Sequence, residues 1–261
     1  MRISWQGLIL CLAVFGPVVL GQSAVAQRYA NDRQQAGQAG VEQLFALANQ
    51  SRAAQGAGPL RWDPALAAAA LQHCRRMAAE GPISHRYGGE PDLTARAGQA
   101  GAHFSLIEEN VAVGSYPATI HQGWMDSPGH RSNLLNPQVD RVGIAVVAAN
   151  GVIYAVADYA RAVQTLSPAQ VEATIAGILQ GHGIMVLKDP TDARAYCSNG
   201  AKNPSQPGFL MRWQNPDLTQ LPQALMNQIA SGRYRKATVG SCPPQNVEGA
   251  FTTYRVAVLL Y

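Results

Sequence analysis

One stretch decides the fold predicted for this 261-residue chain: Trp124-Met125-Asp126-Ser127-Pro128-Gly129-His130-Arg131-Ser132-Asn133-Leu134-Leu135-Asn136-Pro137. The tryptophan and the two leucines are packing residues, whereas Ser-Pro-Gly is a turn that ends the preceding helix. His130 follows that turn, where a side chain can be presented to a cleft. Ser84-His85 and Glu108-Glu109-Asn110-Val111 lie upstream. We expect these three segments to converge on one polar cleft.

The pattern around this stretch predicts helices first and then an antiparallel hairpin. Apolar residues recur with helical spacing over residues 41–48, and Asp63-Pro64 is a strong helix start. A further helix is expected over residues 117–126. After Pro137 two short apolar runs flank Asn150-Gly151, which is the strongest short hairpin signal. This order indicates an α+β domain over residues 41–163, not a parallel sheet.

The chain restarts near Thr165. Ser167-Pro168-Ala169-Gln170 has the residues of a capping box and predicts a helix to Gln180. A second helix and four strands are expected after it. Residues 165–261 are therefore predicted to form a small α+β C-terminal domain or an extension packed on the first domain. We find no internal repeat in the sequence. The expected elements are strands near 184–188, 209–213, 234–239 and 252–261 and a helix near 218–230.

The N-terminus is predicted to be an export signal over residues 1–26. It has a positive Arg2, an apolar run from Leu8 to Leu20 that is short for a membrane span, and a small-residue cleavage pattern ending at Ala26. We expect a flexible leader over residues 27–40 and no membrane span in the mature chain. The protein is therefore expected to be secreted or periplasmic.

Composition and cysteine usage agree with an exported globular protein. Apolar residues make up 47% of the chain, and the net charge of +4 shows no basic run, so no nucleic-acid partner is expected. Beyond the export signal three cysteines remain. Cys197 and Cys242 lie in glycine- and proline-rich surroundings and are predicted to form a disulfide. Cys74 falls on an apolar helix face and is expected to be a buried thiol.

Two of the six histidines, His85 and His130, lie in turns rich in glycine and serine. Two imidazoles and the Glu109 carboxylate would be a sensible ligand set for zinc, although no local motif such as His-Glu-x-x-His is present. Ser127 lies near His130, but its Ser-Pro-Gly setting fits a turn better than a nucleophile. We therefore predict no catalytic residue.

The motifs resemble the bacterial branch of the CAP superfamily, which includes cysteine-rich secretory, antigen 5 and pathogenesis-related proteins. The resemblance rests on His85 after Ser84, on Glu109-Asn110-Val111-Ala112, on the stretch from Trp124 to Leu135, and on Trp62-Asp63-Pro64. It covers residues 41–160 and implies an α-β-α sandwich with a central antiparallel sheet covered by helices. Residues 165–261 carry no motif that resembles a known family.

The resemblance also implies a cleft with two histidines and two acids, which in animal and plant members sometimes holds a divalent metal. His85, Glu109 and His130 match three of these positions. The fourth falls near Ser127, with Asp126 adjacent, so this chain departs from the family pattern there. Glu108 is a second departure, because the family usually has glycine at that position.

Three functions remain open at this point. The first is an extracellular or envelope binding module whose cleft engages a lipid, an envelope component or a protein through His85, Glu109, Asp126, Ser127 and His130. The second is a metal-dependent hydrolase that uses His85, Glu109 and His130. The third is a structural envelope protein in which the same side chains hold loops together.

Overall fold

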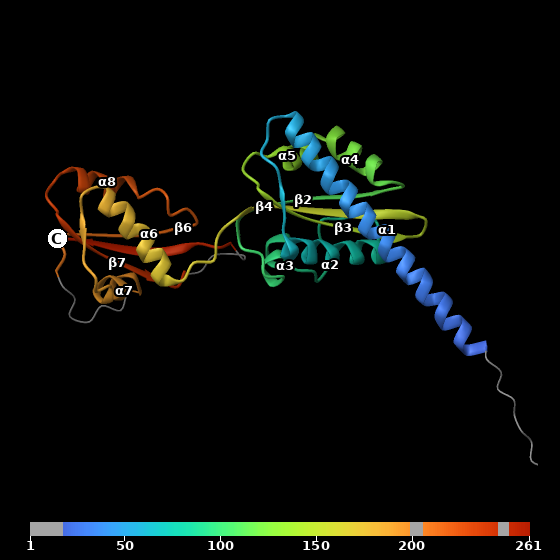
Figure 1. Cartoon of the computed structure of the whole chain (residues 1–261), viewed down its shortest axis with the longest axis horizontal. Coiled ribbons are helices and arrows are strands. Elements are labelled where there is room, and N and C mark those ends of the chain that lie inside the picture. Colours follow the sequence, from blue (N-terminus) through green and yellow to red (C-terminus); the bar gives the residue numbers. More distant parts are fainter. Residues whose placement is uncertain (1–17, 199–205, 245–250) are drawn as a thin grey trace, which may run out of the picture.

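The computed structural model describes residues 18–198, 206–244 and 251–261, and Figure 1 shows two layered units that follow one another along the chain. The first unit contains α1 Val18–Ala54, β1 Arg61–Trp62, α2 Pro64–Glu80, α3 Leu93–Gln99, β2 Phe104–Gly114, α4 Pro117–Asp126, α5 Pro128–Leu135, β3 Arg141–Ala149 and β4 Val152–Ala162. The second contains α6 Pro168–Gly181, β5 Met185–Val186, α7 Thr191–Ser198, β6 Phe209–Asn215, α8 Gln223–Ala230, β7 Lys236–Cys242 and β8 Tyr254–Leu260.

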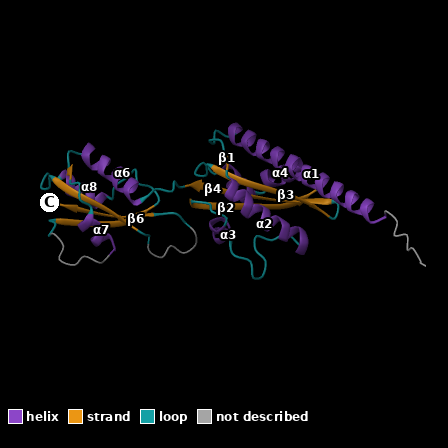
Figure 2. Cartoon of the chain, turned by 60° about the horizontal axis from the view of Figure 1, so that its bottom comes forward, coloured by secondary structure: helices purple, strands orange, loops and turns teal. Residues whose placement is uncertain are grey.

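The first unit is a three-layered sandwich. Its sheet has the strand order β1-β3-β4-β2, with β1 parallel to β3 and the other neighbours antiparallel. Helices α1, α4 and α5 cover one face of this sheet, and α2 and α3 cover the other (Figures 1 and 2). The α-β-α architecture implied by the family resemblance is therefore confirmed.

Local signals set the ends of the elements. The Asp63 carboxylate accepts hydrogen bonds from the amides of Ala65 and Leu66, so it caps α2, which ends at Glu80 with Gly81 as its C-cap. The hairpin between β3 and β4 turns at Asn150 and Gly151, whose φ angles are 53° and 78°. Both residue types tolerate this left-handed conformation, as a two-residue hairpin turn requires.

The core of the sandwich is built around the stretch that begins at Trp124. Trp124 and Leu134 are buried against Leu44 and Tyr159, and the Trp124 indole donates a hydrogen bond to the Val111 carbonyl at 3.3 Å. On the opposite face, Gly143 lets α2 lie directly on β3. A Cβ at Gly143 would lie 2.0 Å from the backbone nitrogen of Ala67.

The expectation for residues 27–40 is wrong. The structure continues α1 without a break from Val18 to Ala54, so this segment is helical rather than a flexible leader. Gly37 and Gly40 are buried where α1 approaches Val146, so the C-terminal end of this segment packs on the domain. Residues 1–17 of the predicted export signal lie outside the described residues. None of the described helices is long and apolar enough to span a membrane.

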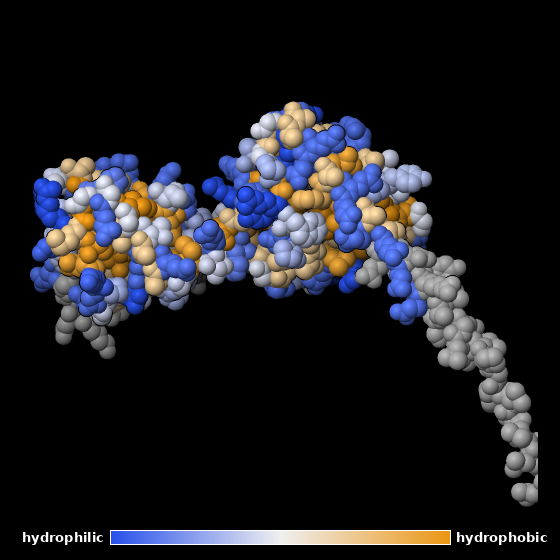
Figure 3. All heavy atoms as spheres, in the orientation of Figure 1, coloured by the Kyte–Doolittle hydropathy of each residue, from blue (hydrophilic) through white to orange (hydrophobic). Residues whose placement is uncertain are grey.

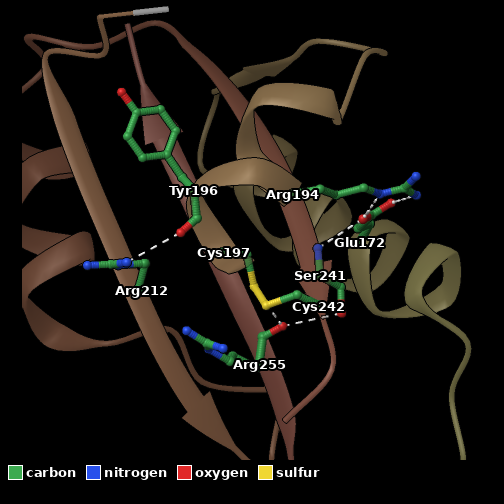
Figure 4. Close-up of a disulfide and its surroundings, with 8 residues drawn as sticks. All are labelled: Glu172, Arg194, Tyr196, Cys197, Arg212, Ser241, Cys242 and Arg255. Carbon is green, nitrogen blue, oxygen red and sulfur yellow. Dashed lines mark hydrogen bonds and ion pairs between the residues drawn. A yellow bond between two sulfur atoms is a disulfide. The ribbon is translucent and has the colours of Figure 1, made fainter. Parts of the chain in front are cut away.

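The second unit has its own core and disulfide. Leu179 of α6, Leu225 of α8 and Val258 of β8 are buried together. The predicted disulfide between Cys197 and Cys242 is confirmed and joins α7 to β7 (Figure 4). The sequence did not predict α7, the helix that carries Cys197.

The two units share one topology. The second sheet has the order β5-β7-β8-β6, again with a two-residue first strand parallel to the third and antiparallel pairs elsewhere. Helices α6 and α8 lie on one face and α7 lies on the other, as α1, α4 and α2 do in the first unit (Figure 1). An Asp-Pro pair, Asp63-Pro64 or Asp189-Pro190, precedes α2 and α7 alike. The chain therefore contains a structural repeat that its sequence does not reveal.

Candidate functional site

The candidate site lies at the sheet edge formed by β2. Glu109 of β2 is buried, and its carboxylate accepts a hydrogen bond from His85 Nδ1 at 2.8 Å and pairs with the guanidinium of Arg96 on α3. The side chain of Glu109 is 3% exposed and that of His85 is 60% exposed. The carboxylate is thus fixed inside the protein, while the imidazole that it orients reaches the solvent.

A second buried pair fixes the loop that carries His85. His73 of α2 is bonded through Nδ1 to the Glu90 carboxylate at 2.7 Å and through Nε2 to the Ser84 carbonyl at 2.8 Å. Glu90 also accepts the backbone amide of Tyr87. Burial raises the pKa of Glu90, but its hydrogen bonds from Tyr87 and His73 outweigh burial and leave that pKa below its ordinary value. The loop is therefore held on both sides of His85.

A third acid lies beneath the site. Asp158 of β4 is directly opposite Glu109 in the sheet, and both of its carboxyl oxygens are buried without a hydrogen-bond partner in the described part of the chain. Burial raises the pKa of Asp158 well above its ordinary value, the Glu109 carboxylate raises it further, and Arg96 opposes both effects. These effects favour the neutral form of Asp158 beside the pair of Glu109 and Arg96.

Helix α5 brings His130 to the same edge from the other face of the sheet. The Asn110 amide donates to the His130 carbonyl at 2.9 Å, and the Asn133 amide donates to the Glu109 carbonyl at 3.1 Å. Asn133 also donates to the Asn110 side chain. These bonds fix α5 to β2, which explains why Asn110 and Asn133 accompany the two site residues in the sequence.

The pKa values of His85 and His130 are shifted in opposite directions. The hydrogen bond to Glu109 raises the pKa of His85 above its ordinary value. Burial lowers the pKa of His130, and the nearby His85 lowers it further. The site therefore favours a protonated His85 beside a neutral His130.

The other predicted site residues have different roles. The Asp126 carboxylate is exposed and accepts a hydrogen bond from Gln122 one turn earlier on α4. Ser127 is the residue between α4 and α5, in agreement with its interpretation as a turn. The fourth acid of the family pattern is therefore not supplied by Asp126 in this arrangement.

The predicted zinc ligands do not assemble as a set. Among the described residues, no group of three or more histidine, cysteine, aspartate or glutamate side chains has the arrangement of a metal site. Glu109 is already engaged by His85 and by the positive charge of Arg96, which would repel a cation. The residues present do not fit the three-ligand zinc site.

Four residues of this network were missed at the level of sequence: His73, Glu90, Arg96 and Asp158. Asp158 had a usable signal, because it interrupts the apolar strand Val156-Ala157-Asp158-Tyr159-Ala160. A buried ionisable group in such a strand is uncommon and marks a partnered or perturbed site. Arg96 and Glu90 had no comparable signal.

Part of the first unit is similar in sequence to known proteins. Residues 45–159 match the CAP family, described as the cysteine-rich secretory protein family. The uncharacterized protein YkwD of Bacillus subtilis (strain 168) is 29% identical over 115 residues, which are 42% of this chain and 44% of that protein. The uncharacterized membrane protein YlbC of the same organism is 32% identical over 110 residues, 40% of this chain and 31% of that protein. The matches thus span less than half of either relative.

Two solved structures are also similar. An extracellular protein containing a SCP domain from Bacillus anthracis str. Ames has a TM-score of 0.47 and 29% identity, covering 50% of this chain and 43% of that one. An outer surface protein from Borrelia burgdorferi has a TM-score of 0.45 and 19% identity, covering 47% and 92%. With the family match and the motifs at His85, Glu109 and His130, residues 45–159 form a domain of the CAP superfamily.

Proposed function

We propose that the chain is an exported binding module whose CAP domain holds an envelope or extracellular ligand at His85. The observation that carries this proposal is the contrast between Glu109 and His85. Glu109 is buried and fully engaged, whereas His85 is largely exposed and its Nε2 has no hydrogen-bond partner among the described residues. The exposed nitrogen is thus available to a ligand.

The chemistry of this nitrogen limits the ligand. Because Glu109 accepts from Nδ1 and raises the pKa of His85, the protonated imidazole presents an Nε2–H donor with a positive charge. Such a group binds an anionic or strongly accepting group, such as the phosphate of a lipid headgroup or a carboxylate of an envelope polymer or protein. A lipid, an envelope component and a protein therefore all remain within the proposed ligand class.

Two binding probes test the proposal. The full chain is titrated with phosphatidylglycerol vesicles and, separately, with soluble peptidoglycan fragments, and His85 is followed by NMR. We expect one probe to bind, with binding lost in His85→Ala and retained in His182→Ala, which removes an exposed histidine of the second unit. Binding that is unchanged in His85→Ala, or no binding of either probe, would contradict the proposal.

A structural envelope protein is the second candidate. It is favoured by the dense bonding of Glu109, Asn110 and Asn133, which would hold the loops together without any ligand. The exposure of His85 separates the two candidates, because a purely structural network gives no role to an outward Nε2. Unchanged thermal stability in His85→Ala together with lost binding would favour the binding module.

A further inference from the structure

A pocket lies where the CAP domain meets the second unit. Its volume is about 640 Å³, within the range of common small-ligand sites, and such sites often lie between domains. In Figure 3 the molecule narrows at this junction, and hydrophilic side chains gather beside it. The pocket is lined by β4, by the linker of residues 163–167, by α6 and by the loop between β6 and α8, and its lining includes Arg161, Gln164, Leu166, Thr174, Asp217 and Tyr254.

Direct contacts join the walls of this pocket. Just before β8, the Thr252 amide donates to the Phe104 carbonyl of β2 at 2.8 Å, and the ring of Phe251 packs edge-on against the Phe104 ring. The Tyr254 hydroxyl donates to the carbonyl of Gln164 in the linker. The segment that enters β8 therefore contacts both the CAP sheet and the linker.

Arg161 brings a positive charge to the pocket. It lies near the end of β4 and is exposed, and its guanidinium has no hydrogen-bond or salt-bridge partner within the part of the chain that the structure describes. An arginine in a protein stays protonated, and its planar group matches the geometry of a carboxylate. Arg161 is therefore available to an anionic group.

Asp217 brings a negative charge from the second unit. Its Oδ1 accepts from the Thr219 amide at 2.8 Å and from the Thr219 hydroxyl at 2.6 Å, whereas Oδ2 has no hydrogen-bond partner among the described residues. The hydrogen bonds from Thr219 lower the pKa of Asp217, burial raises it, and the charge of Arg161 lowers it further. The carboxylate is thus held in position and ionised at neutral pH.

The two charges line one pocket without forming an ion pair. Arg161 affects the pKa of Asp217, but the two side chains form no salt bridge in the described structure. Thr174 and Asn215 add polar groups to the lining, and Leu218 adds an apolar one. A ligand that uses the whole pocket must therefore carry an anion and a cation a short distance apart.

We propose that this pocket binds a short peptide with free ends, in its zwitterionic form. The terminal carboxylate pairs with Arg161 and the terminal ammonium with Oδ2 of Asp217, each through charge-assisted hydrogen bonds. The side chains of the peptide contact Leu166 and Leu218. This site is separate from His85, and it stands whatever the His85 site binds.

Ligands with one kind of charge, or with none, fit this pocket less well. A carboxylate or phosphate alone would pair with Arg161 but would place a second negative charge near Asp217. A neutral sugar would partly remove both charges from water without giving either one a partner of opposite sign, which costs free energy. The zwitterion provides a partner for each.

The test uses the full chain and three dipeptides: alanyl-alanine, leucyl-alanine and seryl-alanine. Each is titrated by calorimetry in three forms, with free ends, with an acetylated N-terminus and with an amidated C-terminus. We expect at least one dipeptide with free ends to bind. Each of the two modifications should weaken its binding at least tenfold, because each removes one of the two charges.

Two variants assign the ends of the peptide. Arg161→Gln and Asp217→Asn should each weaken binding of the dipeptide with free ends at least tenfold. Asparagine keeps an oxygen that accepts from Thr219, so the turn is expected to persist. The amidated dipeptide should gain no further loss from Arg161→Gln, and the acetylated one should gain none from Asp217→Asn.

Asp189→Asn is the matched control. The Asp189 carboxylate accepts from the amide and the hydroxyl of Thr191 in the same kind of turn, but it lies outside the pocket. This variant should bind the dipeptide as wild type does, and so should His85→Ala, which separates the two sites.

Three results would overturn the proposal. In the first, none of the three dipeptides binds. In the second, Arg161→Gln and Asp217→Asn leave the affinity unchanged or weaken it no more than Asp189→Asn does. In the third, the acetylated or amidated dipeptides bind as tightly as those with free ends.

Discussion

Glu109 is the residue on which the stability of the CAP site depends. Glu109→Gln removes the charge that pairs with the buried Arg96 guanidinium, and leaving such a charge unpaired costs about 3 kcal/mol or more. The measurement is urea unfolding at pH 7. Glu108→Gln is the matched control, because the adjacent Glu108 is half-buried and accepts from Asn136. We expect the control to change the free energy of unfolding by less than about 1 kcal/mol, and equal losses in both variants would contradict this role for Glu109.

His121 makes stability depend on pH. It is buried between α1 and α4, with Nε2 bonded to Ser51 at 2.9 Å and Nδ1 without a partner among the described residues. Burial lowers its pKa in the folded state, so the unfolded chain binds the proton more readily. Its contribution to stability is therefore complete above the unfolded pKa, near 6.5, and is lost as the pH falls below that value.

His121→Gln should flatten the dependence of the unfolding free energy on pH between about 7.5 and 5.5. His182→Gln, at an exposed histidine of the second unit, should keep the wild-type slope. The raised pKa of His85 gives the unfolding free energy a pH slope of the opposite sign. The slope of each variant is therefore compared with that of wild type, in which the contribution of His85 is the same. A slope that is the same in His121→Gln and in wild type would refute the assignment.

At the scale of elements, two glycines set the distance between a helix and the sheet. A Cβ on Gly143 would lie 2.0 Å from Ala67 N, and one on Gly240 would lie 2.2 Å from Arg194 N. Both contacts involve backbone near the start of the second helix of each unit, which cannot move like a side chain. Gly143→Ala should therefore destabilise the CAP domain by about 3 kcal/mol or more.

Gly123→Ala is the control for this substitution. Gly123 lies in α4, and nothing comes within 4 Å of an added Cβ. Alanine should stabilise the helix there by about 0.5–1 kcal/mol, because glycine loses more backbone entropy on folding. The melting temperature of each variant is compared with that of wild type. If both variants melted above wild type, or both below it, the close approach of α2 to β3 would be contradicted.

At the scale of the whole molecule, the two units are expected to unfold separately. Each has its own sheet and core, and the disulfide lies wholly in the second. Its cysteines are 45 residues apart, so loop closure in the unfolded chain gives a stabilisation of about 4 kcal/mol. The double substitution Cys197→Ala and Cys242→Ala should lower only the transition of the second unit in calorimetry.

Cys74→Ala provides the complementary variant in the CAP domain. Cys74 is a free, buried thiol on α2, and burial raises its pKa to about 12, so it stays protonated and unreactive. Its removal should lower only the CAP transition. A single transition that shifts as a whole in both sets of variants would show that the units unfold together.

The sequence by itself determined the elements whose signals are local. The caps at Asp63 and Ser167, the hairpin at Asn150-Gly151 and the limits of the helix over 117–126 depend on neighbouring residues and were predicted correctly. The pairing of Cys197 with Cys242 was also predicted, since few cysteines were available. The helical state of residues 27–40 was missed, because packing of Gly37 and Gly40 on β3 overrides their weak helix propensity.

Only the tertiary structure decided which residues complete the site. The sequence motifs identified His85 and Glu109. Arg96, His73 and Asp158 lie on other elements of the fold and come close to Glu109 only in the folded chain. The shared topology of the two units was likewise invisible, because strand pairing is set by which faces are buried and many sequences satisfy the same pattern. Local sequence fixes local hydrogen bonds, whereas charge pairing and sheet edges depend on distances that exist only after the chain has folded.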